Sequence, residues 1–233
     1  MSRFKVTIII VTYNAGKFIE ECIQSIVNRQ IASLQLIVMD GGSTDDTLQI
    51  LASFREHIDV LVSEKDKGIY DAMNKALPYI KGSWVLFMGA DDRLLPSFSE
   101  MEEQLQDPNT IYYGDCVTSD GILGDAFSRY RLTKMSICHQ GIFYPAQVFQ
   151  KYAYQLQYIV YADHILNMQC WGDPAFSKKY LPVKVCYYNL TGFSSYGDDK
   201  IFWKDKARMI RRHLGWITYI RYRYKKIKKK GFR

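Results

Sequence analysis

Two adjacent carboxylates, Asp91 and Asp92, follow a short apolar segment in the first half of the chain. Residues 85–88 are an unbroken apolar run, which is typical of a strand buried on both faces of a parallel sheet. Open α/β sheets bind ligands at the carboxyl ends of their strands, where these two acids would lie. A pair of carboxylates can hold Mg²⁺ or Mn²⁺ for a phosphate-bearing ligand. The alternative is an acidic turn after a core strand.

Polar side chains also follow three earlier predicted strands. Thr12 and Asn14 follow the first strand, Asp40 follows the second, and the polar loop 64–68 follows the third. Because the carboxyl ends of parallel strands share one edge of a sheet, we expect all these groups on the same rim as the two acids. Core formation requires no polar residues at this rim, so the coincidence indicates a ligand-binding site.

The elements that must position these groups alternate between strand and helix. Strands are predicted over residues 6–11, 34–39, 58–62 and 85–88, and helices over residues 15–27, after the turn at 40–45, and over residues 69–80. This alternation implies right-handed βαβ units and a parallel sheet. After residue 110 the alternation ends, and we expect short strands over 111–127, helices over 144–152 and 161–171, and a late strand over 180–190. The predicted fold class is α/β, with a mostly parallel central sheet flanked by helices.

Composition and charge indicate a mildly acidic body with a basic C-terminal tail. The 233 residues, 48% of them hydrophobic, are enough for one large domain. Residues 204–233 hold 13 Lys and Arg against one acid, a net charge of +12, which leaves −5 on residues 1–203 out of +7 overall. Five scattered cysteines without paired spacing argue against structural zinc and disulfides and favour a reducing cytoplasm. We expect no signal peptide and no membrane-spanning run of about 20 apolar residues.

Four segments before residue 93 form a recognisable series: TIIIVTYNAGKFIEECIQSI, VMDGGSTDDT, SEKDKGIYDAMNKAL and FMGADD. In their order and spacing they resemble the inverting glycosyltransferases of family 2, which have the GT-A fold. Each segment alone is a weak signal, but four in order are specific. The resemblance implies a Rossmann-like GT-A domain over residues 1–200. Within it, residues 1–110 would bind a nucleotide sugar and residues 111–200 an acceptor, and a basic, aromatic helical tail would follow over 201–233.

The resemblance also implies roles for the residues at the strand ends. In similar enzymes the residue matching Asp40 accepts a hydrogen bond from the imide N–H of uracil. Thr12 and Asn14 match positions that contact the nucleotide. Lys67 would place a cation near the base or the diphosphate, and Asp91 matches a position near the ribose.

The resemblance implies metal binding by Asp92, which matches the last acid of the family's D-x-D motif. Here the motif reads Ala90-Asp91-Asp92, so its first acid is missing and the predicted Mn²⁺ or Mg²⁺ site depends mainly on Asp92. A cation bridging the diphosphate would neutralise charge on the departing nucleotide.

An inverting transfer also needs a base for the acceptor hydroxyl, on the face opposite the leaving group. Asp163 resembles the family's acid at the start of a helix that faces the sugar, and Asp115 is the second candidate. The alternative for Asp163 is a helix N-terminal acid that the helix dipole stabilises. His139 and Gln140 match a His-Gln step of many relatives, and we expect them on the acceptor or donor-sugar side.

The tail is predicted to be an amphipathic helix with both bases and aromatic residues. Its apolar residues recur at helical spacing, at Ile210, Leu214, Ile217, Tyr224 and Ile227. Such a helix is typical of binding to an anionic membrane surface. The alternatives are packing of its first turns on the domain and binding of nucleic acid. The resemblance favours the membrane, because many relatives extend lipid-linked glycans at its cytoplasmic face.

Together these features predict a metal-dependent inverting transferase of a hexosyl or N-acetylhexosaminyl group. It would act on a UDP-sugar and a lipid-linked glycan in surface polysaccharide biosynthesis, in the cytoplasm and peripherally at the inner face of the cell membrane. Transfer directly to polyprenyl phosphate is an alternative within the family. A nucleic-acid-binding module is an alternative of another class, but the charge of −5 on residues 1–203 argues against a nucleic-acid partner. A Rossmann dehydrogenase is excluded because no G-x-G-x-x-G follows the first strand.

Overall fold

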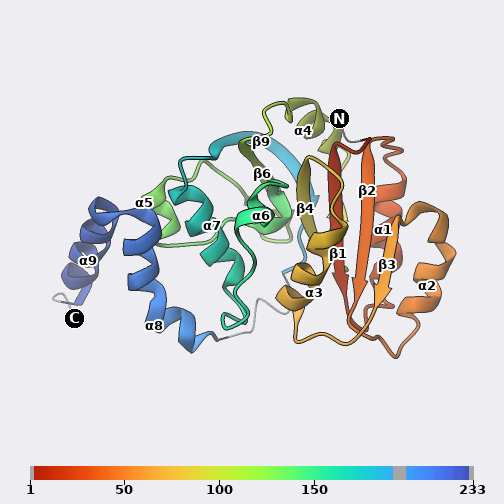
Figure 1. Ribbon diagram of the computed structural model, residues 1–233, viewed down its shortest axis with the longest axis horizontal. Coiled ribbons are helices and arrows are strands. Elements are labelled where there is room, and N and C mark those ends of the chain that lie inside the picture. Colours follow the sequence, from red (N-terminus) through yellow and green to blue (C-terminus); the bar gives the residue numbers. More distant parts are fainter. Residues whose placement is uncertain (1–2, 191–197, 231–233) are drawn as a thin grey trace.

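The computed structural model describes residues 3–190 and 198–230, which form a mixed sheet with helices on both faces (Figure 1). The strands are β1 (Val6–Thr12), β2 (Leu34–Asp40), β3 (Val60–Ser63), β4 (Trp84–Gly89), β5 (Arg93–Leu94), β6 (Thr110–Thr118), β7 (Gly121–Leu123), β8 (Ile142–Pro145) and β9 (Ser177–Tyr187). The α-helices are α1 (Ile19–Val27), α2 (Thr47–Ser53), α3 (Ile69–Ala76), α4 (Phe98–Gln104), α5 (Arg129–Leu132), α6 (Val148–Lys151), α7 (Ala162–Gly172), α8 (Lys200–Met209) and α9 (Trp216–Lys230). Shorter helical turns are η1 (Arg55–His57), η2 (Leu77–Tyr79), η3 (His139–Gly141) and the π-helical η5 (Ile210–Leu214). Residues 231–233 of the predicted tail lie outside the described residues.

The first strand forms the centre of the parallel region of the sheet. All seven residues of β1 are β-branched, which favours extended backbone, and all are buried. β1 pairs in parallel with β2 and with β4, and β2 pairs in parallel with β3. These four strands confirm the predicted α/β architecture.

Strand register brings the predicted polar groups to one edge of the sheet. Thr12 at the end of β1 is paired with Asp40 at the end of β2, and Asp40 is paired with Ser63 at the end of β3. On the other side of β1, Val11 is paired with Gly89, so Asp91 follows β4 at the same edge. The shared rim that the sequence predicts is therefore present.

β8 joins the two halves of the molecule. It pairs antiparallel with β4 on one side and with β6 on the other, and the sheet continues through β9 to β5. The predicted helix over residues 144–152 is wrong at its start, because Ile142–Pro145 is a fully buried strand and only Val148–Lys151 is α-helical. A short apolar run is compatible with either a helix or a strand. Here the run is a strand because it pairs with both β4 and β6.

Two hydrophobic layers cover the faces of the sheet. Alternate residues of β1 point to opposite faces, so Ile9 packs with α3 and α7 while Ile8 packs with α1. The layer with α7 is rich in aromatic side chains, among them Tyr144 and Tyr154, which both pack edge-on against Phe87. Both faces are therefore sealed, and the strand ends are the region of the sheet left open to a ligand.

The C-terminal region is divided between a packed segment and an exposed helix. Phe202 of α8, Ile210 and Leu214 belong to the core layer on the α7 side. The chain runs so close to α7 that a Cβ on Gly172 would lie 1.9 Å from the His213 carbonyl oxygen. α9 lies at the end of the long axis, beside α5 and far from β1 (Figure 1). Among the described helices none is long and apolar enough to cross a bilayer.

Candidate functional site

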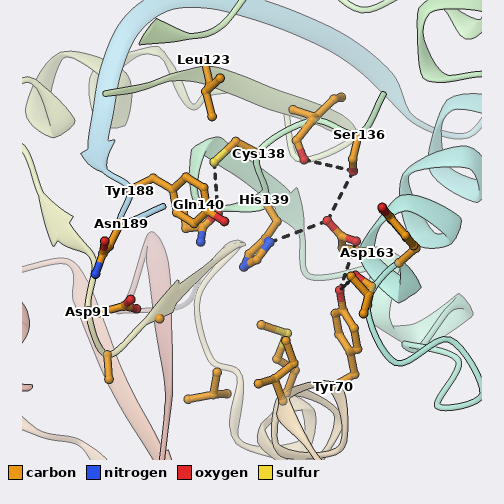
Figure 2. A pocket seen from close by; sticks show the side chains of 18 of the residues that line it. Tyr70, Asp91, Leu123, Ser136, Cys138, His139, Gln140, Asp163, Tyr188 and Asn189 are labelled. Atoms are coloured by element: carbon orange, nitrogen blue, oxygen red, sulfur yellow. Dashed lines mark hydrogen bonds and ion pairs between the residues drawn. The ribbon is translucent and has the colours of Figure 1, made fainter. Parts of the chain in front are cut away.

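A cavity of about 1000 Å³ opens at the carboxyl ends of β1 and β4. Figure 2 shows Asp91 and Asp163 on opposite sides of it, with His139 and Gln140 between them. Residues from both halves of the chain line it, including Thr12, Asn14, Asp66, Tyr70, Asp91, Tyr113, Ser136, His139, Gln140 and Asp163. The cavity thus gathers most of the residues that the sequence predicts for the site.

The turn after β1 is fixed by the loop after β2. The Asn14 backbone has φ 49°, a left-handed conformation that asparagine tolerates. Its side-chain oxygen accepts the Thr44 N–H at 2.9 Å and its own N–H donates to Ser43 Oγ at 2.8 Å. The helix predicted over residues 15–27 starts later, at Ile19, and the Asn14 side chain is used by this loop.

Thr12 lines the same cavity and carries a buried polar atom that lacks a protein partner. Its Oγ1 is buried, and among the described residues it has no hydrogen-bond partner. An unsatisfied buried hydroxyl costs about 1–3 kcal/mol, so such groups usually meet a water or a ligand. This hydroxyl is therefore suited to a water or a ligand on the β1 side of the cavity.

Asp40 is turned away from the cavity and into its own loop. One carboxylate oxygen accepts the N–H groups of Gly42 and Ser43, both at 3.0 Å, and the Ser63 hydroxyl at 2.6 Å, while the other accepts the Ser43 hydroxyl. Gly42 has φ 83°, which glycine adopts without strain. Asp40 is not among the cavity-lining residues, so in this structure it holds the loop 40–43 in place.

The loop before α3 contributes Asp66 rather than Lys67 to the cavity wall. Lys67 is exposed, and its backbone N–H donates to Asp71. Asp66 lines the cavity and accepts the Gly68 N–H at 2.8 Å. Asp66 was not among the residues predicted for the site, although it lies in the same family segment as Lys67.

The two acids after β4 have different environments. Asp91 lines the cavity, and burial raises the pKa of its carboxyl. Asp92 is 1% exposed, and its two oxygens accept the N–H groups of Gly89 at 2.7 Å and Asn189 at 3.3 Å. Burial raises the pKa of Asp92 to about 6, although the Gly89 hydrogen bond opposes this.

The described residues contain no cluster of three or more His, Cys, Asp or Glu side chains able to hold a metal. Mg²⁺ commonly binds through one or two carboxylates and completes its shell with water and substrate phosphates. The Asp91 carboxylate at the cavity, with the buried Asp92 next to it in the chain, fits that kind of donor set.

Asp163 faces the cavity from the first turn of α7. Its Oδ1 accepts the Tyr70 hydroxyl at 3.1 Å and the His164 N–H at 2.7 Å, and its Oδ2 accepts the Ser136 hydroxyl at 3.3 Å (Figure 2). Nδ1 of His139 lies 3.7 Å from the same Oδ2. Burial raises the pKa of the Asp163 carboxyl, but the proximity and charge of His139, with His164, outweigh burial and lower it below its usual value. Asp163 is therefore an ionised carboxylate at neutral pH.

His139 and Gln140 connect the two acidic sides of the cavity. They form η3, and the Gln140 side chain accepts from Cys138 Sγ at 3.1 Å and hydrogen-bonds to Asp92. His139 approaches Asp163 on the other side. Asp115, in contrast, accepts the Tyr180 hydroxyl at 2.7 Å and is not among the cavity-lining residues.

Besides Asp66, three residues of the site were not anticipated: Tyr70, Ser136 and Asn189. Tyr70 lies in the third family segment, so the resemblance contained a signal for it. Ser136 and Asn189 stand in segments with no recognisable pattern, and only the fold brings them to Asp163 and Asp92.

Comparison with known proteins agrees with this geometry. The family model "Glycosyl transferase family 2" matches residues 7–167. The PGL/p-HBAD biosynthesis glycosyltransferase of Mycobacterium tuberculosis is 35% identical over 210 residues, 85% of this chain and 82% of that protein. The Escherichia coli protein WfgD, a UDP-Glc:alpha-D-GlcNAc-diphosphoundecaprenol beta-1,3-glucosyltransferase, is 30% identical over 138 residues, 57% of this chain and 54% of that protein.

A solved structure shares the fold. Staphylococcus aureus TarS 1-349 in complex with UDP-GlcNAc superposes with a TM-score of 0.72 at 19% identity. The match covers 91% of this chain and 66% of that chain, so this chain spans slightly less than two thirds of the TarS fragment.

Proposed function

The chain belongs to glycosyl transferase family 2, and we propose that it transfers a sugar from a UDP-sugar to a lipid-linked glycan acceptor with inversion at the anomeric carbon. The observation that carries this proposal is the position of Asp163. An ionised, buried carboxylate faces the strand-end residues of the family segments across one cavity. This is the arrangement that an in-line displacement requires, with leaving group and base on opposite sides.

The nucleotide belongs on the β1 and β4 side of the cavity. Thr12 Oγ1 offers an unsatisfied hydroxyl there, and Asp66 and Asp91 add partly exposed acceptors for base or ribose hydroxyl and N–H groups. Asp40 supports this side from behind by ordering the loop that clamps Asn14. The predicted contact of Lys67 with base or diphosphate requires its exposed side chain to fold over the bound donor. A UDP donor agrees with the UDP-sugars named for WfgD and the TarS complex.

A divalent cation, Mn²⁺ or Mg²⁺, belongs at Asp91 and Asp92. When bound, it neutralises charge on the diphosphate leaving group. Asp91 offers its carboxylate at the cavity surface, and Gln140 and the Gly89 N–H hold the neighbouring Asp92 in place.

Asp163 acts as the general base in this mechanism. The acceptor oxygen attacks the anomeric carbon, the bond from that carbon to the diphosphate oxygen breaks, and the acceptor proton moves to a carboxylate oxygen of Asp163. Tyr70 and Ser136 donate hydrogen bonds that aim the carboxylate, and His139 stabilises its charged form. Holding the base within reach of the hydroxyl typically contributes about 10²–10⁴-fold in rate.

An apolar rim supports an acceptor that carries a lipid. Ile122 and Leu123 of β7 and Met135 line the cavity, yet they are 41–55% exposed. Such side chains suit the apolar portion of a prenyl-linked acceptor better than a free polar sugar. We therefore assign residues 1–110 to donor binding and residues 111–200 to acceptor binding, consistent with the diphosphoundecaprenol in the name of WfgD.

The proposal is tested by a transfer assay that varies donor and acceptor separately. UDP-, GDP- and dTDP-sugars are offered with Mn²⁺ or Mg²⁺, and the acceptors are a prenyl diphosphate-linked sugar, prenyl phosphate and the corresponding free sugar. We expect turnover with a UDP-sugar and the prenyl diphosphate-linked sugar, with inverted configuration by NMR. Transfer to prenyl phosphate alone would support the alternative acceptor, and absence of donor cleavage with every pair would refute the proposed reaction.

A further inference from the structure

The outer face of α9 carries a continuous row of exposed apolar side chains. Trp216, Ile217, Ile220, Tyr224 and Ile227, here called the α9 stripe, are between 61% and 86% exposed. At 3.6 residues per turn these five positions fall within an arc of about 100°. Tyr219 and Tyr222, on the opposite side of the helix, pack against the core. The stripe therefore points away from the domain.

Exposed bases border the α9 stripe on both sides. The same helical geometry places Arg221, Lys225 and Lys228 on one flank and Arg223 and Lys226 on the other, and all five are exposed. The described residues of α9 include no acid. Apolar residues with Trp and Tyr in the centre, and cations at both margins, characterise a helix that lies in a membrane interface.

α9 contacts η5 and α5 of the domain. It starts directly after Gly215, which ends η5 with φ 87°, and the Tyr219 N–H donates to the Gly215 carbonyl at 3.0 Å. The Arg221 guanidinium lies 3.8 Å from the centre of the Tyr130 ring of α5. The next residue of α5, Arg131, lines the cavity. α9 is thus in contact with α5, which contributes to the wall of the candidate active site.

We propose that the α9 stripe docks on the surface of an anionic lipid bilayer and holds the cavity in a fixed orientation to it. A second copy of the chain is disfavoured, because pairing two stripes would bring the bordering bases of both copies together. An anionic leaflet neutralises these bases, each contributing about 1 kcal/mol near the surface, while the stripe enters the headgroup region. The docking itself is independent of the proposed reaction. The functional benefit of a fixed orientation of the cavity to the bilayer rests on the proposed lipid-linked acceptor.

Docking is measured by cosedimentation with phosphatidylcholine vesicles with and without phosphatidylglycerol. We expect the wild type to bind only when phosphatidylglycerol is present, and a combined Ile217→Ser, Ile220→Ser, Ile227→Ser variant to bind weaker by about tenfold per substitution. Ile159→Ser and Ile201→Ser are matched controls, because these isoleucines are also exposed (55% and 48%) but lie outside the stripe. The controls should bind like the wild type.

Depth of insertion distinguishes the stripe from the rest of the C-terminal region. Brominated lipids should quench tryptophan fluorescence in the wild type and in Trp203→Phe, but not in Trp216→Phe. Trp203 of α8 is 52% exposed, so it is a matched control for Trp216. Quenching that survives in Trp216→Phe would place the contact elsewhere and overturn the proposal.

A flexible glycine-serine insertion after Gly215 tests the fixed orientation. The insertion should leave vesicle binding and transfer to a soluble acceptor unchanged, and lower transfer to a vesicle-borne acceptor. If the insertion variant transfers to both the soluble and the vesicle-borne acceptor as well as the wild type does, α9 is only a tether and the orientation is not fixed.

Three results would reject the membrane as partner. They are failure of the wild type to bind phosphatidylglycerol vesicles, dimerisation that the stripe variant abolishes, and preferential binding of single-stranded RNA in the same buffer. Because vesicle binding needs no substrate, these results are separate from any failure of the proposed transferase reaction.

Discussion

Asp163 owes its proposed role to neighbours that keep it charged and aimed. Tyr70, Ser136 and the His164 N–H all donate to it, and His139 lies beside it. Asp163 lies at the N-terminus of α7, where the helix dipole alone would favour an acid. Its hydrogen bonds to groups from other elements go beyond that interaction. The same neighbours make the residue testable, because an amide in its place would retain the shape but not the basicity.

Asp163→Asn should lower turnover by at least about 10²-fold and leave donor affinity nearly unchanged, because only proton transfer is lost. Steady-state kinetics and calorimetric titration of UDP provide the two values. Asp115→Asn is the matched control, since Asp115 is also buried and hydrogen-bonded but does not line the cavity. An inactive Asp115→Asn beside a normal Asp163→Asn would mean that the other carboxylate is the base.

Asp91→Asn should reduce the gain in UDP affinity that Mn²⁺ provides, without changing thermal stability, because Asp91 faces the cavity. Asp92→Asn should reduce that gain and also destabilise the fold. Both Asp92 oxygens accept backbone N–H groups, so one of them would face the new amide NH₂. Calorimetry with and without Mn²⁺ and thermal denaturation measure these effects. If Mn²⁺ increases UDP affinity in both variants as much as in the wild type, the metal does not bind at Asp91 and Asp92.

At the scale of elements, the contact between α5 and α7 depends on a neutral histidine. His164 of α7 is 2% exposed, its Nε2 lies 2.6 Å from the Leu132 carbonyl at the end of α5, and burial lowers its pKa to about 4. This contact closes the wall of the cavity that also carries Arg131, and through Tyr130 it supports α9.

Stability should therefore fall as the pH decreases from about 6.5 to about 4. The unfolded chain binds a proton at His164 in this range and the folded chain does not, so the neutral form contributes stability above pH 6.5 that is lost below it, at most about 3 kcal/mol. Urea denaturation over this pH range should show a smaller decrease for His164→Gln, whose amide can still donate to Leu132. Parallel curves for the two proteins would contradict this assignment.

At the scale of the whole molecule, the basic tail predicted over residues 201–233 combines two different structures. Asp199 caps α8 through the Phe202 N–H and also accepts the Val160 N–H, and Phe202, Ile210 and Leu214 are buried. The first half of this region therefore packs within the catalytic domain, and the exposed segment begins at α9.

A chain that ends at Leu214 should remain folded and bind UDP, whereas one that ends at residue 198 should lose more than about 5 kcal/mol of stability. Each large apolar side chain removed from the core contributes about 1.5–3 kcal/mol. Chemical denaturation and UDP calorimetry compare the two chains with the wild type. Equal stability of both truncated chains would show that α8 and η5 contribute nothing to the core.

The sequence by itself determined the parallel half of the sheet and the edge at which the site lies. The β-branched run of β1, the apolar run before Asp91 and the polar residues at the strand ends are local patterns, and local patterns decide which segments become strands. The sequence did not resolve the short apolar run Ile142–Pro145, which is a strand because β4 and β6 lie on either side of it.

Only the tertiary structure decided which carboxylates face the cavity. Asp66, Asp91, Asp125 and Asp163 line it, whereas Asp40, Asp92 and Asp115 do not, and these three accept hydrogen bonds from protein groups. The donors include Ser63, Asn189 and Tyr180, which lie 23, 97 and 65 residues away in the chain. A buried carboxylate turns toward the donors that satisfy it, and no local pattern indicates donors at such separations. The same reason explains why α8 is packed while α9 is exposed, since Phe202 finds partners on α7 and Tyr161 that the α9 stripe lacks.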